Sequence, residues 1–96
     1  MSVFAFVEIT VKDPETYTRY MEAVPPVIEA HGGSYVVRSS RVMPISGGWS
    51  PDRMIVIKFA TLEDLRRCFQ SPDYQTLAEL RERATLTRSL VVEDEV

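Results

Sequence analysis

The sequence is poor in the residues that usually mark disulfide, metal or membrane chemistry. Cys68 is the single cysteine, which permits no internal disulfide and favours a reducing compartment. Apolar runs reach only about five residues, whereas a membrane-spanning helix needs about 20. The first residues also lack the basic segment, apolar stretch and cleavage site of a secretion signal. We therefore expect a cytoplasmic protein.

An excess of positive charge is also missing. The 11 basic and 14 acidic side chains give a net charge of −3, and the two signs are interspersed. Nucleic acid is not an expected partner, because a phosphate backbone needs a basic stripe. No His, Cys or carboxylate cluster has metal-ligand spacing, so we expect no metal and no cofactor, and haem on the one histidine, His31, has no support.

What is present fits one folded domain spanning residues 1–96. A length of 96 residues with 45% hydrophobic content is enough to bury a single core. The segment Val3–Val11 alternates with a period of two and so predicts a strand with one apolar face.

A helix is expected to follow this strand. Asp13 is a suitable cap, Pro14 suits the first helical position, and the Gly-Gly pair at 32–33 suits the end. Pro25 and Pro26 lie within the pattern, and because proline removes a helical hydrogen bond we expect a kink or break near residue 24.

The rest of the chain supplies three more strands and a second helical region. We predict strands at 34–42, 53–59 and 86–92, a loop at PISGGWSP, and helical segments beginning at Thr61 and again within SPDYQTLAELR (residues 71–81). The order strand, helix, strand, strand, helix, strand is that of the α+β, ferredoxin-like sandwich, with an antiparallel four-stranded sheet and helices on one face.

The other face of that sheet is expected to mix apolar and charged side chains. Alternation assigns to it Phe4, Phe6, Glu8, Arg38, Met54, Val56, Lys58 and Arg88. Apolar patches of this kind usually meet a partner, and the simplest partner is a second copy of the chain.

Three stretches together resemble the bacterial family called domain of unknown function 1330: HGGSYVVR (31–38), GGWSPDRMIVIKF (47–59) and SPDYQTLAELR. The resemblance covers nearly the whole chain. It implies a small protein of the dimeric α+β barrel superfamily, in which two ferredoxin-like sheets associate and each protomer keeps a cleft between sheet and helices. Two positions depart from the family pattern: Ser46 replaces an acidic residue before the loop glycines, and Ala60 replaces a proline.

Two residues are candidates for catalysis. His31 could transfer protons at neutral pH, or could simply be a helix-end residue held by a carbonyl group. Tyr74 shares a helical face with Leu77 and Arg81, so it could hydrogen-bond a ligand at the rim of the cleft, or bury its ring and leave its hydroxyl in water.

Four residues are candidates for ligand binding. Arg53 could bind a carboxylate, or pair with a neighbouring acidic side chain. Trp49 could cover a ligand or contact a second copy. Arg81 could join Tyr74 at the rim or form a surface ion pair. Arg38 is the fourth candidate, whereas Cys68 is interpreted as a buried apolar residue.

The sequence therefore predicts a homodimer that binds a small, partly apolar molecule, carboxylate-bearing or aromatic. By analogy with the superfamily this could be a cofactor-independent isomerase or monooxygenase-like enzyme. The alternative is a non-catalytic binding or structural homodimer. A ligand-sensing regulator is disfavoured, because no DNA-binding segment is attached.

Overall fold

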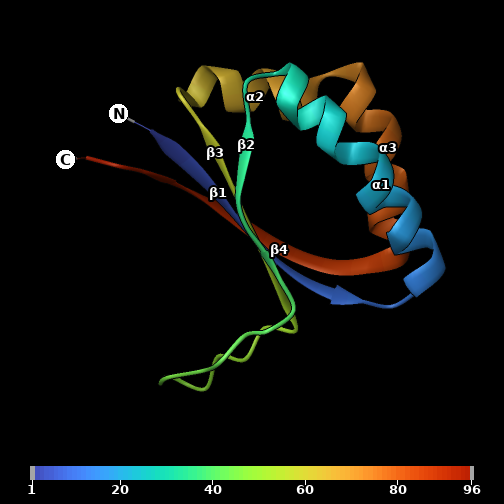
Figure 1. Cartoon of the computed structure of the whole chain (residues 1–96), viewed down its shortest axis with the longest axis vertical. Helices are drawn as coiled ribbons and strands as arrows, with labels where there is room; N and C mark the ends of the chain where they lie inside the picture. The colour runs from blue at the N-terminus through green and yellow to red at the C-terminus, as the bar shows by residue number, and fades with distance from the viewer. Residues whose placement is uncertain (1, 96) are drawn as a thin grey trace.

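The computed structural model describes residues 2–95 of the chain. The elements follow in the order β1 (Val3–Val11), α1 (Pro14–Ala30), β2 (Ser34–Ser39), β3 (Arg53–Phe59), α2 (Leu62–Gln70), α3 (Pro72–Ala84) and β4 (Thr85–Glu93). The four strands form one antiparallel sheet in the order β2-β3-β1-β4. The three helices lie on one side of it (Figure 1). The predicted ferredoxin-like fold is confirmed, with its second helix divided in two.

Strand β1 lies in the middle of the sheet and defines its two faces. Ala5 pairs with Ile57 on β3 and with Val91 on β4, so these three side chains point toward the helices. We call this the inner face. On β1 the inner residues Val3, Ala5 and Ile9 are 4%, 4% and 2% exposed, which confirms the predicted apolar side of the strand.

Helix α1 begins as predicted but is not broken. The Asp13 carboxylate accepts a hydrogen bond from the Thr16 N–H, and Pro14 occupies the first turn. The helix continues through Pro25 and Pro26 to Ala30, so a break near residue 24 is wrong, whereas the alternative, a kink there, stays a prediction. Proline fixes φ near the helical value, but each of the two removes a helical hydrogen bond and crowds the carbonyl one turn earlier. Burial of Val24 and Ile28 on the core side offsets that cost.

The two glycines after α1 serve different purposes. Gly32 has φ +84°, a left-handed conformation that ends the helix, and its N–H donates to the Glu29 carbonyl. A Cβ on Gly33 would lie 2.6 Å from Ile28 and 2.8 Å from Phe59. Gly33 therefore lets the turn pack directly against the core.

Helices α2 and α3 each begin with a capping hydroxyl. The Thr61 hydroxyl accepts from the Asp64 N–H, and the Ser71 hydroxyl accepts from the Tyr74 N–H. Pro72 directly follows Ser71, which is extended, so the chain bends there and α3 starts as a separate helix.

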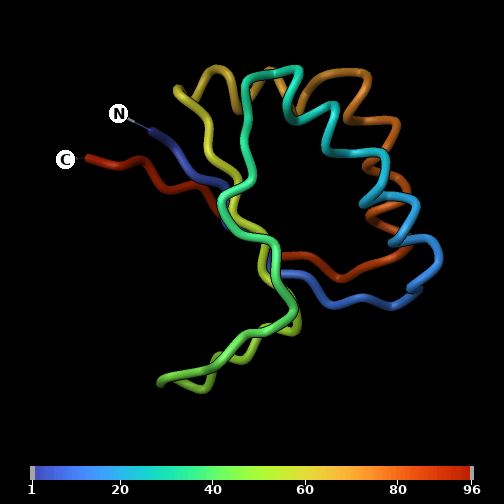
Figure 2. The backbone as a smooth tube through the Cα atoms, viewed as in Figure 1, coloured from blue at the N-terminus to red at the C-terminus, as the bar shows by residue number. Residues whose placement is uncertain are grey.

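The connection between β2 and β3 projects from the side of the sheet that the helices leave bare (Figures 1 and 2). Strand β2 ends at Ser39, which pairs with Met54, rather than at residue 42 as predicted. Its partner strand begins at Arg53, two residues after Pro51, which has no N–H for a ladder bond. Met43 and Ile45 in this connection are 81% and 98% exposed. Within residues 2–95 no helix is long and apolar enough to cross a bilayer.

Candidate functional site

A cavity of about 460 Å³ lies between the inner face of the sheet and the helices. We call it the helix–sheet cavity. Its apolar walls include Ala5, Val7, Ile9, Met21, Val24, Ile28, Ile55, Ile57, Leu65, Phe69 and Ala78. The exposed residues Glu82, Ser89 and Val91 also line it, which places its opening beside β4 and the end of α3. A mostly apolar hollow of this volume is typical of small-molecule sites.

Three side chains from two helices form a polar chain in the wall of the cavity. The hydroxyl of Tyr20 on α1 lies 3.1 Å from the hydroxyl of Tyr74 on α3. The guanidinium of Arg81, two turns further along α3, donates to the Tyr74 hydroxyl at 2.8 Å. Both tyrosines are buried, at 7% and 4% exposure, and all three residues line the cavity.

The charge of Arg81 is only weakly balanced. Its side chain is 27% exposed, and its one acidic neighbour among the described residues is the exposed Glu82, at 4.0 Å. The ring of Phe69 packs edge-on against Tyr74 with centroids 4.8 Å apart, which fixes the phenol at the wall. The sequence-based pairing of Tyr74 with Arg81 on one helical face is thus seen as a direct hydrogen bond.

A β-bulge places a third tyrosine and an arginine on the inner side. Tyr35 pairs with Ile57 and Arg38 pairs with Ile55, because the register shifts between Tyr35 and Val37. Tyr35 lines the cavity, and the Arg38 guanidinium lies over its ring at 4.5 Å. The prediction that Arg38 lies on the outer face is therefore wrong, since simple alternation ignores the extra residue.

Burial raises the pKa of two phenols that line the cavity, those of Tyr20 and Tyr35. It raises the pKa of Tyr35 to about 12, an effect that the nearby Arg38 reduces. Burial, followed by the neighbouring Tyr74, also raises the pKa of Tyr20 well above its ordinary value. These hydroxyls are therefore hydrogen-bond donors at neutral pH.

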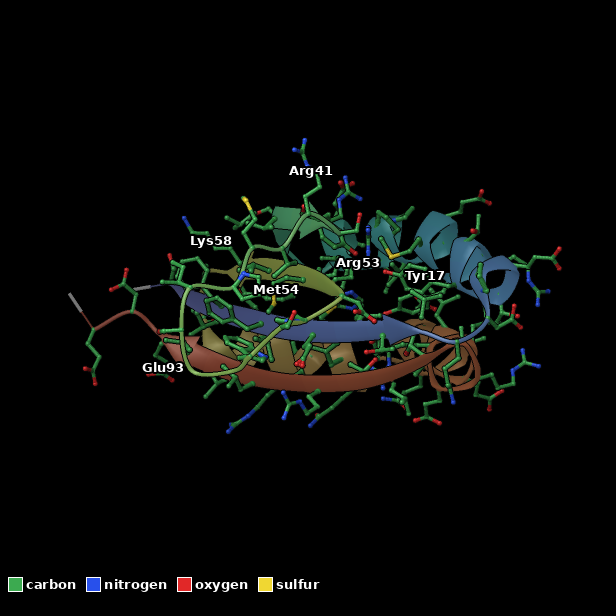
Figure 3. The ribbon with its side chains drawn as sticks, turned by 90° about the horizontal axis from the view of Figure 1, so that it is seen from below. Tyr17, Arg41, Arg53, Met54, Lys58 and Glu93 are labelled. Carbon is green, nitrogen blue, oxygen red and sulfur yellow. The ribbon has the colours of Figure 1, made fainter. Side chains whose placement is uncertain are left out.

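A second arginine–tyrosine pair lies outside the cavity lining. Arg53 at the start of β3 points toward Tyr17 on α1 (Figure 3), and its Nε donates to the Tyr17 hydroxyl at 2.8 Å. Burial raises the pKa of Tyr17, and Arg53 opposes this. Arg53 bonds the phenol rather than Asp52 or Glu8, the acidic partners considered from the sequence.

His31 lies at the end of α1, away from the polar chain. Its Nδ1 is 2.9 Å from the carbonyl of Val27, one turn earlier, which is the helix-end contact considered from the sequence. His31 is not among the residues that line the helix–sheet cavity. Its role in proton transfer stays a prediction.

The outer face of the sheet carries a separate hollow of about 460 Å³ beneath the β2–β3 connection. Trp49 donates from its indole to the Glu8 carboxylate at 3.0 Å, and Arg88 donates to both oxygens of the same carboxylate at 2.8 and 2.9 Å. These bonds, the Arg88 bond first, hold the pKa of Glu8 below its usual value. Trp49 therefore lies on the opposite side of the sheet from the helix–sheet cavity.

Metal-binding and nucleophilic groups do not gather at either hollow. Within residues 2–95, no three His, Cys, Asp or Glu side chains come together as metal ligands. Cys68 is fully buried, and burial raises the pKa of its thiol to about 11.

Sequence reasoning identified two members of the polar chain and missed the rest of the hydroxyls. Tyr20 and Tyr35 look like core residues in the sequence, because both lie on apolar faces of their elements. The contact between Tyr20 and Tyr74 joins residues 54 positions apart. The available signal was the recurrence of tyrosine on several elements that face one space.

Comparison with known families identifies the chain. The model of the family named domain of unknown function 1330 matches residues 2–94, so the chain belongs to this family. No curated protein sequence matches it.

Solved structures with the same fold are distant in sequence. A protein of unknown function from Rhodopseudomonas palustris superposes with a TM-score of 0.81 at 16% identity, over 97% of this chain and 82% of that one. A dimeric ferredoxin-like protein of unknown function from Thermobifida fusca gives 0.71 at 12% identity, over 98% and 92%. SnoaB, a cofactor-independent oxygenase from Streptomyces nogalater, gives 0.70 at 11% identity, over 99% and 94%. These likenesses show the ferredoxin-like fold.

Proposed function

For this member of the domain of unknown function 1330 family, we propose that the helix–sheet cavity binds a small, partly apolar molecule. The observation that carries the proposal is the hydrogen-bonded chain of Tyr20, Tyr74 and Arg81 in the wall of an otherwise apolar cavity. Apolar walls with a few placed polar groups are the usual composition of ligand sites, since the walls supply affinity and the polar groups orient the ligand.

Placing the guanidinium of Arg81 beside the cavity has a cost that a structural role alone does not explain. The side chain is largely covered, and a charge taken from water needs compensating partners. Here it has a neutral phenol at 2.8 Å and an exposed carboxylate at 4.0 Å. A ligand that accepts hydrogen bonds would supply the missing compensation.

The geometry favours binding over base catalysis. SnoaB is an oxygenase of the same fold, which supports an enzyme only by analogy of fold. Proton abstraction requires a base within reach of the ligand. Among the described residues that line the cavity, Glu82 is the one carboxylate, and its side chain is 72% exposed at the mouth. Glu82 is therefore the carboxylate of the lining that a cofactor-independent isomerase or monooxygenase could use as a base.

We also propose that the protein is a homodimer joined through the outer face. That face leaves large apolar side chains of β4 in water, with Leu86, Leu90 and Val92 at 62%, 59% and 45% exposure. Related structures of the same fold are described as dimeric. A second copy is the simplest cover for such a patch.

Neighbouring residues of β4 offer a matched test of ligand binding. Val91 lines the helix–sheet cavity and Val92 lines the outer hollow, and their exposures are nearly equal at 44% and 45%. The probe is N-phenyl-1-naphthylamine, an uncharged aromatic dye that fluoresces in apolar surroundings. We expect Val91→Trp to abolish a saturable dye signal that Val92→Trp retains.

Two results would contradict binding in the cavity. The wild-type protein could give no saturable signal, or Val91→Trp could bind the dye as the wild type does while Val92→Trp does not. Native mass spectrometry of gently purified protein adds the assembly and the mass of any retained molecule. An added mass per protomer that Val91→Trp loses would identify the natural ligand class.

A further inference from the structure

The polar groups of the helix–sheet cavity are unbalanced between hydrogen-bond donors and acceptors. Arg81 can only donate, so the Tyr74 hydroxyl is the acceptor in their 2.8 Å bond. Tyr74 and Tyr20 then share one hydrogen bond at 3.1 Å. Whichever hydroxyl donates in it, one of the two phenol protons is left without an acceptor among the described residues.

Tyr35 adds a further unused donor. Its hydroxyl has no hydrogen-bond partner within the described part of the chain, although its ring lines the cavity and packs under Arg38. No buried side-chain N or O among the described residues is both unpartnered and closed off from solvent. The Tyr35 hydroxyl is therefore open to the cavity or to water.

Acceptors are scarce at the same place. Gln75 lines the cavity, and its amide N–H donates to the Phe69 carbonyl at 2.6 Å. The amide oxygen of Gln75 and the hydroxyl of Ser89 are acceptors in the lining, but neither forms a hydrogen bond with the polar chain or with Tyr35. Glu82 is the one carboxylate in the lining among the described residues, and it lies 4.0 Å from Arg81 at the exposed mouth. One proton of the Tyr20–Tyr74 pair and the proton of the Tyr35 hydroxyl thus have no hydrogen-bond acceptor among the described residues.

We infer that the cavity selects molecules whose polar end is an acceptor with negative charge, a carboxylate or a phenolate, on an apolar body. Tyr35 and the Tyr20–Tyr74 pair are the donors, and Arg81 acts through Tyr74 as a positioning residue. This inference rests on the proposed function, because it specifies the ligand of the same cavity. The raised pKa values of Tyr20 and Tyr35 agree with it, since both phenols stay protonated when an anion binds.

Two probes of one size and opposite hydrogen-bonding character test the inference. They are 2-naphthoate, whose carboxylate only accepts, and 2-naphthylmethylammonium, whose head group only donates. Isothermal titration calorimetry at neutral pH measures both affinities. We expect 2-naphthoate to bind at least about tenfold more tightly, because its carboxylate accepts charge-assisted hydrogen bonds from the free phenol donors and is attracted by Arg81, whereas the ammonium has the same sign of charge as Arg81.

Tyr35→Phe is the sharpest variant, because it removes a hydroxyl that bonds nothing within the described protein. It should leave the melting temperature unchanged and weaken 2-naphthoate binding about tenfold without affecting the ammonium probe. Tyr17→Phe is the control, since an arginine lies over the ring of Tyr17 as over that of Tyr35, but Tyr17 is not part of the cavity lining. The control should bind both probes as the wild type does.

The outcomes separate this inference from the proposed function. Equal binding of the two probes, or an unchanged affinity for 2-naphthoate in Tyr35→Phe, would overturn the inference while binding in the cavity still holds. The same conclusion follows if neither naphthyl probe binds but the uncharged dye does. If neither probe nor the dye binds, the proposed function fails as well.

Discussion

The two faces of the sheet differ in whether their polar groups have hydrogen-bond or ion-pair partners. On the inner face the apolar side chains are covered, and the polar groups around the cavity are donors with too few acceptors. On the outer face the large apolar side chains of β4 are exposed, whereas the charges of Glu8 and Arg88 are paired with each other. Hydrogen-bond donors without acceptors beside apolar walls suit a small ligand. Charges that are already paired within an exposed apolar patch suit a protein partner.

The largest contrast is expected from removing one phenylalanine from each face. Phe59 is fully buried on the inner side of β3, and Phe6 is half-buried on the outer side of β1. We expect Phe59→Ala to lower the free energy of unfolding by about 3 to 5 kcal/mol, because it leaves a cavity in the core. Phe6→Ala should cost less than about 1.5 kcal/mol. Urea unfolding at one low protein concentration measures both, and similar losses would remove the distinction between the faces.

Regular alternation and helix capping made most of the fold predictable. The bounds of β1 and β3 and the caps Asp13, Thr61 and Ser71 follow from local chemistry, since each involves neighbours in the sequence. Local chemistry does not predict that α1 continues through Pro25 and Pro26. Local rules count the hydrogen bond that a proline removes, but not the tertiary burial of the helix around it.

The site was less predictable, because it depends on contacts between distant segments. One extra residue in β2, a β-bulge, moves Arg38 from the outer to the inner side of the sheet. The β2 sequence contains no glycine that would mark such a bulge. Tyr74 and Arg81 could be paired because they share a helix. Tyr20 could not be added, since its hydroxyl meets Tyr74 only after α1 and α3 pack together.

The second prediction sharpens the contrast on a single strand. Val92→Asp puts a charge on the outer face, and Val91→Asp puts the same charge on the inner face at equal exposure. We expect Val92→Asp to weaken the proposed dimer at least about 100-fold, because an unpaired charge in an interface costs several kcal/mol. Val91→Asp should leave it intact. Sedimentation across a concentration series measures the assembly, and a dimer that survives Val92→Asp but not Val91→Asp would reverse the assignment.

Alkaline pH should affect the inner face first. Burial raises the pKa of Tyr35 from 10.0 to about 12, so its contribution to stability is complete below pH 10 and is lost as the pH rises through about 12. Tyr35→Phe should therefore lose less stability than the wild type across that interval, measured by urea unfolding at each pH. At pH 7 the two proteins should be equally stable, which is the control. Parallel losses would mean that Tyr35 ionises as freely in the folded state as in the unfolded one.

Acid pH should affect the outer face, with the smallest of these effects. The pKa of Glu8 is lowered from 4.5 in the folded state, by Arg88 first and then by Trp49, so the contact is complete above pH 4.5 and is lost as the pH falls through the lower value. Trp49 is the single tryptophan, so its emission reports this loss directly.

Two variants test which carboxylate is responsible. Glu8→Gln should abolish the change in Trp49 emission that precedes global unfolding in acid. Asp13 caps α1 and is another carboxylate of lowered pKa. Asp13→Asn should leave the change in Trp49 emission as it is in the wild type. An emission titration that Asp13→Asn alters and Glu8→Gln does not would place the responsible group at the helix cap rather than on the outer face.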